Sequence, residues 1–208
     1  LVAVRRDFNS SDLYLLGLDG RVKAQLTHNG STVVELNHWA FFPRFSPDGS
    51  SVYYSYDPKD PENTFRVDLA VFAQPIAGTR PSARQWSYPN YYTGGDVHPQ
   101  PLKSGALVYS KFEIDDAGKV YSQIWIQARA GSAGLALTEP ADNCDQPSPS
   151  PDQTKLVMVC THGQLGDLVV APLDAVDFKL GAPTTLLAGK LVAELPMGAD
   201  HHQLGLVG

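Results

Sequence analysis

Three short apolar runs, each preceded by a turn rich in proline, serine, aspartate and glycine, give the chain its clearest hydrophobic pattern. The turns and the runs that follow them are 43–49 and 52–56, 147–153 and 154–159, and a degraded copy at 99–105 and 107–110. Runs of about five β-branched and aromatic residues between such turns are typical of β-strands. The pattern therefore predicts one hairpin written three times.

The first of these turns shows why the backbone should reverse there. Pro47 sets φ for the first corner of a type I turn, Asp48 tolerates a bent backbone, and Gly49 accepts a positive φ without a Cβ clash. The preceding strand and the following Val52–Tyr56 strand are therefore predicted to pair. The turn itself is expected to be structural.

A second periodic signal comes from the strands that follow each hairpin. Leu13, Leu69, Ile124 and Leu168 occupy matching places and lie 56, 55 and 44 residues apart, while Pro43, Pro99 and Pro147 are 56 and 48 apart. Each period holds four predicted strands, which is typical of propeller blades. A four-stranded sheet has two apolar faces and buries both only by stacking against neighbours.

The sequence thus predicts an all-β fold, a β-propeller of four-stranded antiparallel blades with about four blades in this chain. The repeats are expected at about 1–36, 37–87, 96–138 and 144–188, with a closing strand at 200–207. If 200–207 paired with residues 1–6, the ring would close with no exposed edge. The alternative is a fragment of a larger propeller.

The repeated motifs resemble the TolB-like branch of the WD-repeat-like β-propellers. The resemblance rests on S-P-D-G at 46–49, S-P-D-Q at 150–153, and the D-L-Y, Q-I-W and D-L-V strands at 12–14, 123–125 and 167–169. Members include the periplasmic TolB protein, which binds a peptidoglycan-associated lipoprotein, and propellers that gate prolyl-oligopeptidase-type enzymes. The resemblance implies a periplasmic or extracellular location. Those propellers commonly carry six or more blades, which this chain does not reach.

Composition and charge narrow the classes of function. The net charge of -6 and pI of about 5.4, with only 16 scattered Lys and Arg residues, argue against nucleic-acid binding. No run approaches the roughly 20 apolar residues of a membrane helix, so no membrane insertion is expected. The chain has no G-x-S-x-G nucleophile motif, so any hydrolase chemistry would need a catalytic domain elsewhere.

The two cysteines flank the third hairpin. Counting outward from its turn places Cys144 opposite Thr161, one residue from Cys160. A cross-strand disulfide is therefore feasible with a small adjustment of register, and two buried free thiols are the alternative. A disulfide would indicate an oxidising compartment.

The six histidines do not show metal-ligand spacing, because the adjacent His201 and His202 would point to opposite faces of a strand. We expect no metal, no cofactor and no catalytic residue. The loops that enter the innermost strands should instead converge at one mouth of the central channel. The candidate binding residues there are His38, Trp39, Tyr91, Tyr92, Asp96, His98, Asp142, Asn143, Asp145, Asp200 and His201.

Aromatic residues with a few polar anchors are typical of interface hot spots. The sequence therefore favours a non-enzymatic scaffold that binds a protein or peptide partner at this mouth. One alternative is an accessory propeller that gates substrate for a prolyl-oligopeptidase-type hydrolase whose catalytic domain is absent. A weaker alternative is a propeller that binds a carbohydrate or another small ligand.

Overall fold

The computed structural model describes residues 1–59, 68–77, 82–90 and 95–192 of the 208-residue chain. The closing strand expected at 200–207 lies outside the described residues. Within the described ranges the regular elements are β-strands and two short 3-10 helices, η1 (Val34–Leu36) and η2 (Pro140–Asp142). No helix in the described ranges is long and apolar enough to cross a membrane.

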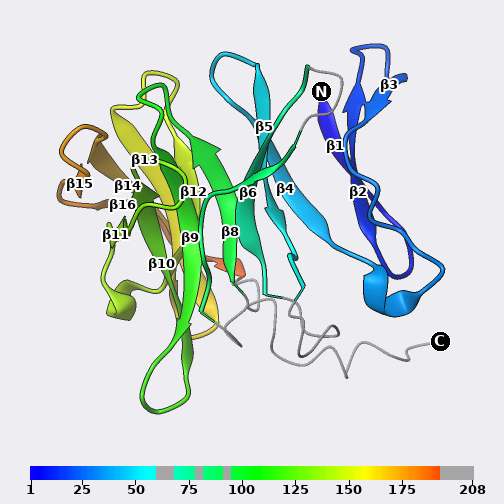
Figure 1. The fold of residues 1–208 in the computed structure, drawn as a ribbon. Helices are drawn as coiled ribbons and strands as arrows, with labels where there is room; N and C mark the ends of the chain where they lie inside the picture. Colours follow the sequence, from blue (N-terminus) through cyan, green and yellow to red (C-terminus); the bar gives the residue numbers. More distant parts are fainter. Residues whose placement is uncertain (60–67, 78–81, 91–94, 193–208) are drawn as a thin grey trace.

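The strands form four antiparallel sheets in chain order (Figure 1). The first sheet contains β1 (Val2–Arg6), β2 (Ser11–Leu16) and β3 (Val22–Gln25). The second contains β4 (Ala40–Phe45), β5 (Ser51–Tyr56), β6 (Ala70–Pro75) and β7 (Arg84–Gln85). The third contains β8 (Asp96–Pro101), β9 (Leu107–Ile114), β10 (Val120–Gln127) and β11 (Gly134–Ala136). The fourth contains β12 (Cys144–Pro149), β13 (Lys155–His162), β14 (Leu165–Asp174) and β15 (Lys179–Leu180), and β16 (Thr184–Val192) also pairs with β14.

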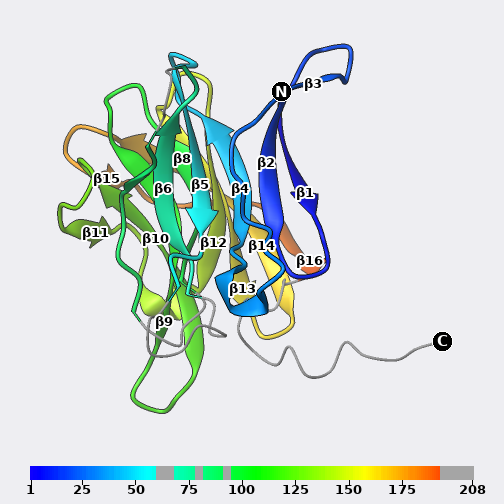
Figure 2. The ribbon, with the colours of Figure 1, turned by 45° about the vertical axis from the view of Figure 1, so that its right-hand side comes forward.

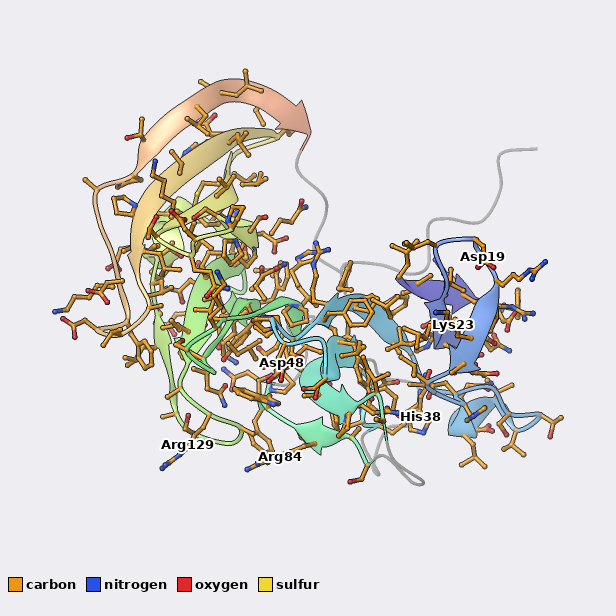
Figure 3. All side chains as sticks on the ribbon, turned by 90° about the horizontal axis from the view of Figure 1, so that it is seen from above. Asp19, Lys23, His38, Asp48, Arg84 and Arg129 are labelled. Atoms are coloured by element: carbon orange, nitrogen blue, oxygen red, sulfur yellow. A yellow bond between two sulfur atoms is a disulfide. The ribbon has the colours of Figure 1, made fainter. Side chains whose placement is uncertain are left out.

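The four sheets stand side by side along an arc, which is clearest from above (Figure 3). Their innermost strands are neighbours, since β4 contacts β8 and β8 contacts β12, while β1 contacts β4. This arrangement confirms the predicted all-β propeller fold with antiparallel blades. The S-P-D-G-type turns lie at one end of the sheets and both 3-10 helices at the other, as Figures 1 and 2 show.

Each pair of neighbouring sheets encloses its own apolar cluster. Leu13 and Val52 belong to the cluster between the first and second sheets, Val71 and Leu107 to the next, and Ile124 with its neighbours to the third. All five of these side chains are at most 1% exposed. The core of the described residues is therefore divided among the interfaces between blades, as radial stacking requires.

In the first three sheets a hydroxyl just beyond the outer strand anchors the neighbouring strand, β2, β6 or β10. The backbone N–H of Leu13 donates to Thr27 Oγ1 (2.9 Å), that of Val71 to Ser87 Oγ (2.9 Å), and that of Ile124 to Thr138 Oγ1 (3.0 Å). The position equivalent to Leu13 in the second blade is therefore Val71, two residues beyond the predicted Leu69.

The repeated turn has the predicted chemistry. In the first copy the N–H of Gly49 donates to the carbonyl of Ser46 (2.9 Å), and Gly49 has a φ of 71°. Hydrogen bonds from the Ser46 side chain, and then from Ser50, lower the pKa of Asp48 to about 2. In the S-P-D-Q copy Gln153 takes the same positive φ, at 61°, without the freedom of glycine.

Replacing Gly49 with alanine should cost about 1–2 kcal/mol of unfolding free energy, because a Cβ in this left-handed conformation meets its own backbone. No other atom lies within 4 Å of the added Cβ, so crowding by neighbours should not contribute. Asparagine at the same place should cost clearly less, since it tolerates positive φ. Urea unfolding of the three proteins checks this order, and an alanine variant as stable as the asparagine variant would contradict it.

Candidate functional site

Each complete blade carries a β-bulge at the same place in its innermost strand. The pairing register shifts by one residue between Phe41 and Arg44, between Val97 and Gln100, and between Asp145 and Ser148. The residues with positive φ at these bulges are Phe42 (52°), His98 (52°) and Gln146 (54°), each followed directly by a proline. A bulge redirects side chains and interrupts pairing, so the three strands are altered together at one level.

Side chains from the three bulges meet on the inner side of the sheets. The ring centroids of Phe42 and His98 lie 4.2 Å apart, and His98 Nδ1 lies 3.0 Å from Asp145 Oδ1. These contacts link β4 to β8 and β8 to β12. Both side chains of the His98–Asp145 pair are mostly buried, at 17% and 18% exposure.

The aromatic contacts continue from Phe42 toward the first sheet. Phe41 packs against Phe42 with centroids 6.0 Å apart, and Trp39 stacks on Phe41 at 5.7 Å and 13°. The guanidinium carbon of Arg6 lies 5.4 Å from the centre of the Trp39 ring, within cation–π range. We call Trp39, Phe41, Phe42 and His98 the inner aromatic row.

A cavity of about 260 Å³ lies beside the inner aromatic row. It is lined by Val2, Ala3, Val4, Phe42, Pro43, Arg44, His98 and Gln100. Within the described part of the chain β1 pairs with β2 alone, and Val2, Ala3 and Val4 of β1 line this cavity. The cavity therefore combines a strand that is unpaired on one side within the described ranges with aromatic and cationic side chains.

Burial alone would raise the pKa of the Asp145 carboxyl, but its hydrogen bonds and the nearby charge together outweigh burial and lower this pKa. Hydrogen bonding and charge from His98, followed by hydrogen bonds from Ser110 and the backbone of Gln146, hold the pKa below its ordinary value. Asp145 therefore stays ionised through the neutral and mildly acidic range. The carboxylate fixes the His98 ring against Phe42.

The structure brings three of the predicted site residues together, namely Trp39, His98 and Asp145. His38 precedes Trp39 in the chain, but its side chain contacts other residues: its Nδ1 is 2.8 Å from the carbonyl of Asp57, and its ring stacks on Tyr56. The row also includes residues that the sequence did not indicate, Phe41 and Phe42, and Arg6 lies over it. An aromatic residue directly before the proline of an innermost strand is the one signal that could have found Phe42.

The other predicted site residues lie elsewhere. Asp96 is fully buried beside Lys111 and does not line the mouth. Asn143 ends η2, and its Oδ1 accepts a hydrogen bond from the backbone of Ser122. Asp142 lines a different pocket, next to the disulfide. Tyr91, Tyr92, Asp200 and His201 are outside the described residues.

Cys144 and Cys160 form a disulfide, with Cα atoms 4.0 Å apart. The two residues pair directly across β12 and β13, whereas counting from the turn placed Cys144 opposite Thr161. The bulge between Asp145 and Ser148 supplies the missing one-residue shift. No group of three or more His, Cys, Asp and Glu side chains in the described ranges is placed to hold a metal ion.

No protein-family model matches the chain, and no curated protein matches it in sequence. Solved structures do resemble it. A putative TolB from Agrobacterium tumefaciens superposes with a TM-score of 0.64 and 18% identity over 89% of this chain and 60% of its own length. TolB from Acinetobacter baumannii superposes with a TM-score of 0.58 and 14% identity, over 88% of this chain and 42% of its own length. A prolyl endopeptidase superposes with a TM-score of 0.52 and 20% identity, over 87% of this chain and 25% of its own length.

These likenesses show a TolB-like β-propeller fold. The chain spans 60% or less of each of these three proteins. At such low identity the comparison carries the fold alone, so a function has to be argued from the residues of this chain.

Proposed function

We propose that this chain is a non-enzymatic β-propeller scaffold that binds a protein or peptide partner at the channel mouth. The observation that supports this function is the inner aromatic row, in which rings from β4 and β8 and the loop before β4 are in contact and partly exposed. Aromatic side chains bury large areas at a low cost in conformational entropy and dominate interface energetics.

The surroundings of the row suit an extended protein segment. Its ends carry opposite charges, with Arg6 over Trp39 and Asp145 bound to His98. β1 lines the cavity beside the row and, among the described residues, has a strand partner on one side alone; free strand edges bind extended peptides through backbone hydrogen bonds. We infer that the partner presents an extended segment with apolar side chains toward the row.

The proposed setting is periplasmic or extracellular. A disulfide between β12 and β13 is typical of proteins that fold in oxidising compartments. The family that the repeats resemble usually has an extracytoplasmic setting. Both observations support the location, and both fit a partner exposed in the same compartment.

A displayed peptide library selected on the whole chain tests the binding function. Enriched peptides should bind Trp39→Ala about 30-fold more weakly than the parent protein, because a hot-spot aromatic contributes about 2 kcal/mol or more. Isothermal titration calorimetry measures the affinities. Tyr88→Ala is the matched control, since Tyr88 is 66% exposed and outside the row.

Two further measurements distinguish a loss of peptide affinity from a loss of protein stability in these variants. Trp39→Phe should retain most of the affinity, because it preserves an aromatic ring over Phe41. Melting temperatures of all variants establish whether each protein is folded at the assay temperature. Peptides that bind folded Trp39→Ala and Phe42→Ala as tightly as the parent would contradict a site at the inner aromatic row.

A second candidate function is an accessory propeller that gates substrate for a peptidase. The similarity in fold to part of a prolyl endopeptidase favours it. The full reading frame of the gene separates the two functions: an adjoining α/β-hydrolase segment would support the gating role, and its absence would support the scaffold.

A further inference from the structure

A second pocket, of about 270 Å³, lies between the third and fourth sheets, away from the inner aromatic row. Three alternate residues of β13 and three of β14 face it, because side chains alternate along a strand: Met158, Cys160, His162, Asp167, Val169 and Ala171. Its floor is apolar and buried, and it consists of Cys144, Met158, Cys160, Val169 and Ala171. We call it the disulfide pocket.

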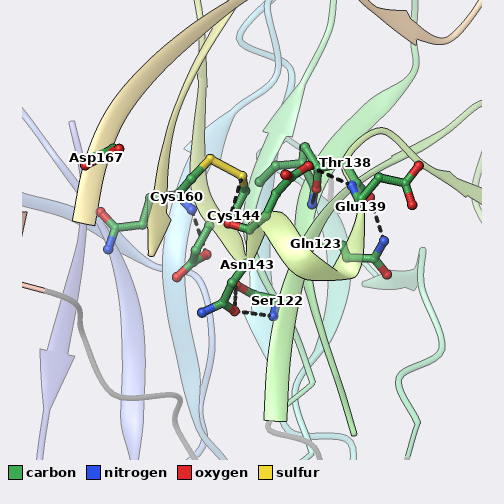
Figure 4. Close-up of a disulfide and its surroundings, with 12 residues drawn as sticks. Ser122, Gln123, Thr138, Glu139, Asn143, Cys144, Cys160 and Asp167 are labelled. Carbon is green, nitrogen blue, oxygen red and sulfur yellow. Dashed lines mark hydrogen bonds between the residues drawn. A yellow bond between two sulfur atoms is a disulfide. The ribbon is translucent and has the colours of Figure 1, made fainter. Parts of the chain in front are cut away.

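The rim of the disulfide pocket is acidic. Carboxylates come from both sides: Glu139 and Asp142 from the segment around η2, and Asp167 from β14. In the view of Figure 4, Asp167 and Glu139 lie on opposite sides of the disulfide. Among the residues lining the pocket, all of them in the described ranges, His162 is the sole side chain able to carry a positive charge.

Local hydrogen bonds hold the rim carboxylates in place. Asp142 Oδ2 accepts a hydrogen bond from the backbone N–H of Glu139 (3.1 Å), and the Glu139 side chain accepts one in return within the same capping box. Asp167 Oδ1 accepts from the backbone N–H of Gly189 at 2.6 Å. Asp167 Oδ2 also lies 3.9 Å from Nε2 of the exposed His162. A carboxylate has about four acceptor positions, so each of the three keeps acceptor capacity for a donor from a ligand.

We propose that the disulfide pocket binds an arginine or lysine side chain presented by a protein partner. These side chains lay an apolar stem on apolar surface and keep a cationic head among polar groups, which matches the floor and the rim. Three carboxylates disfavour an anion. The volume is below the roughly 300–1,000 Å³ typical of sites for drug-sized ligands, so it suits one side chain.

This inference does not depend on the function proposed for the inner aromatic row, because the two sites use different residues. It adds a charge requirement to recognition: a partner should offer a basic residue at the groove between the third and fourth blades. The net charge of -6 reinforces the preference for a basic partner.

Methionine methyl NMR of the whole chain tests the proposal, because Met158 lies on the floor of the pocket. The chain contains two methionines, and Met158→Leu assigns the signal. The probes are acetyl-Gly-Gly-Arg-Gly-Gly-amide and its citrulline analogue, which has the same shape without the charge. The arginine peptide should shift the Met158 signal saturably, with an affinity about tenfold above that of the citrulline peptide.

Asp167→Asn should weaken binding of the arginine peptide about tenfold and leave the citrulline peptide unchanged. Asp177→Asn changes the net charge equally and is the matched control, since Asp177 is 64% exposed, 3.9 Å from Lys179 and outside the pocket. Equal shifts with both peptides, no saturable shift with either, or an equal loss in Asp177→Asn would each overturn the proposal. The melting temperature shows that each variant is folded.

Discussion

Replacing Lys111 with methionine should destabilise the protein by about 3–5 kcal/mol at pH 7, because the change leaves buried carboxylates without their cation. Lys111 Nζ lies 3.3 Å from Asp96 Oδ1 and 3.3 Å from Glu113 Oε1. The side chains of Lys111, Asp96 and Glu113 are 8%, 1% and 14% exposed. Methionine preserves an apolar stem beside the Trp125 ring, which Lys111 approaches to 5.5 Å.

The loss should depend on pH in a defined direction. Burial raises the pKa of Asp96 to about 6, although the charge of Lys111 and hydrogen bonds from Ser87 and Lys111 oppose this rise. Because this pKa is above its ordinary value, the contribution of Asp96 to stability is greatest at low pH and falls as pH rises from about 4 to about 6. Without Lys111 the carboxyl keeps its proton to a higher pH, so the fall should extend beyond pH 6.

Urea unfolding at pH 5 and pH 7 measures both effects. The difference between the parent and Lys111→Met should be smaller at pH 5, where Asp96 is mostly protonated in both proteins. Asp96→Asn combined with Lys111→Met should recover much of the loss at pH 7. Lys119→Met is the control, since Lys119 is exposed on the adjacent hairpin and its replacement should change stability by less than about 0.5 kcal/mol. A loss for Lys111→Met that is equal at both pH values would contradict this account.

The fold class could be predicted because turn chemistry and strand composition repeat together. Pro47, Asp48 and Gly49 act locally, so their effect does not depend on distant residues. Local turn chemistry could not show which residue of the second blade is equivalent to Leu13 of the first. Leu69 and Val71 are both apolar and lie two residues apart, and a shift of two leaves every side chain on the same face of the strand. Two hydrogen bonds distinguish them: the N–H of Val71 donates to Ser87 Oγ, and the carbonyl of Val71 accepts from the N–H of Trp86.

The candidate site could be predicted in part. Trp39, His98 and Asp145 follow from their place before or within an innermost strand, but the contact between Phe42 and His98 does not. A residue before proline normally has an extended backbone, and positive φ is uncommon outside glycine, so sequence patterns gave no reason to expect the bulges. The buried charge cluster around Asp96 was also hidden, because its cation, Lys111, comes from the next strand.

Removing the disulfide should cost about 3 kcal/mol of unfolding free energy. The bond joins residues 16 apart, and closing a loop of this length restricts the unfolded chain by about that amount. It also ties the innermost strand β12 to β13 next to the bulge, where the ladder of paired residues is interrupted. In a chain of this size the loss corresponds to a fall of about 6–12 °C in melting temperature.

The double variant Cys144→Ala/Cys160→Ala, compared with the parent under oxidising and reducing conditions, measures this contribution. A reductant should lower the melting temperature of the parent toward that of the variant and leave the variant unchanged. Thiol titration of the unreduced, denatured parent should detect no reactive thiol, and two reactive thiols would contradict the bond. Because Asp145 adjoins Cys144, loss of the disulfide should also loosen the His98–Asp145 contact, so the variant should bind partners of the inner aromatic row more weakly even where it is fully folded.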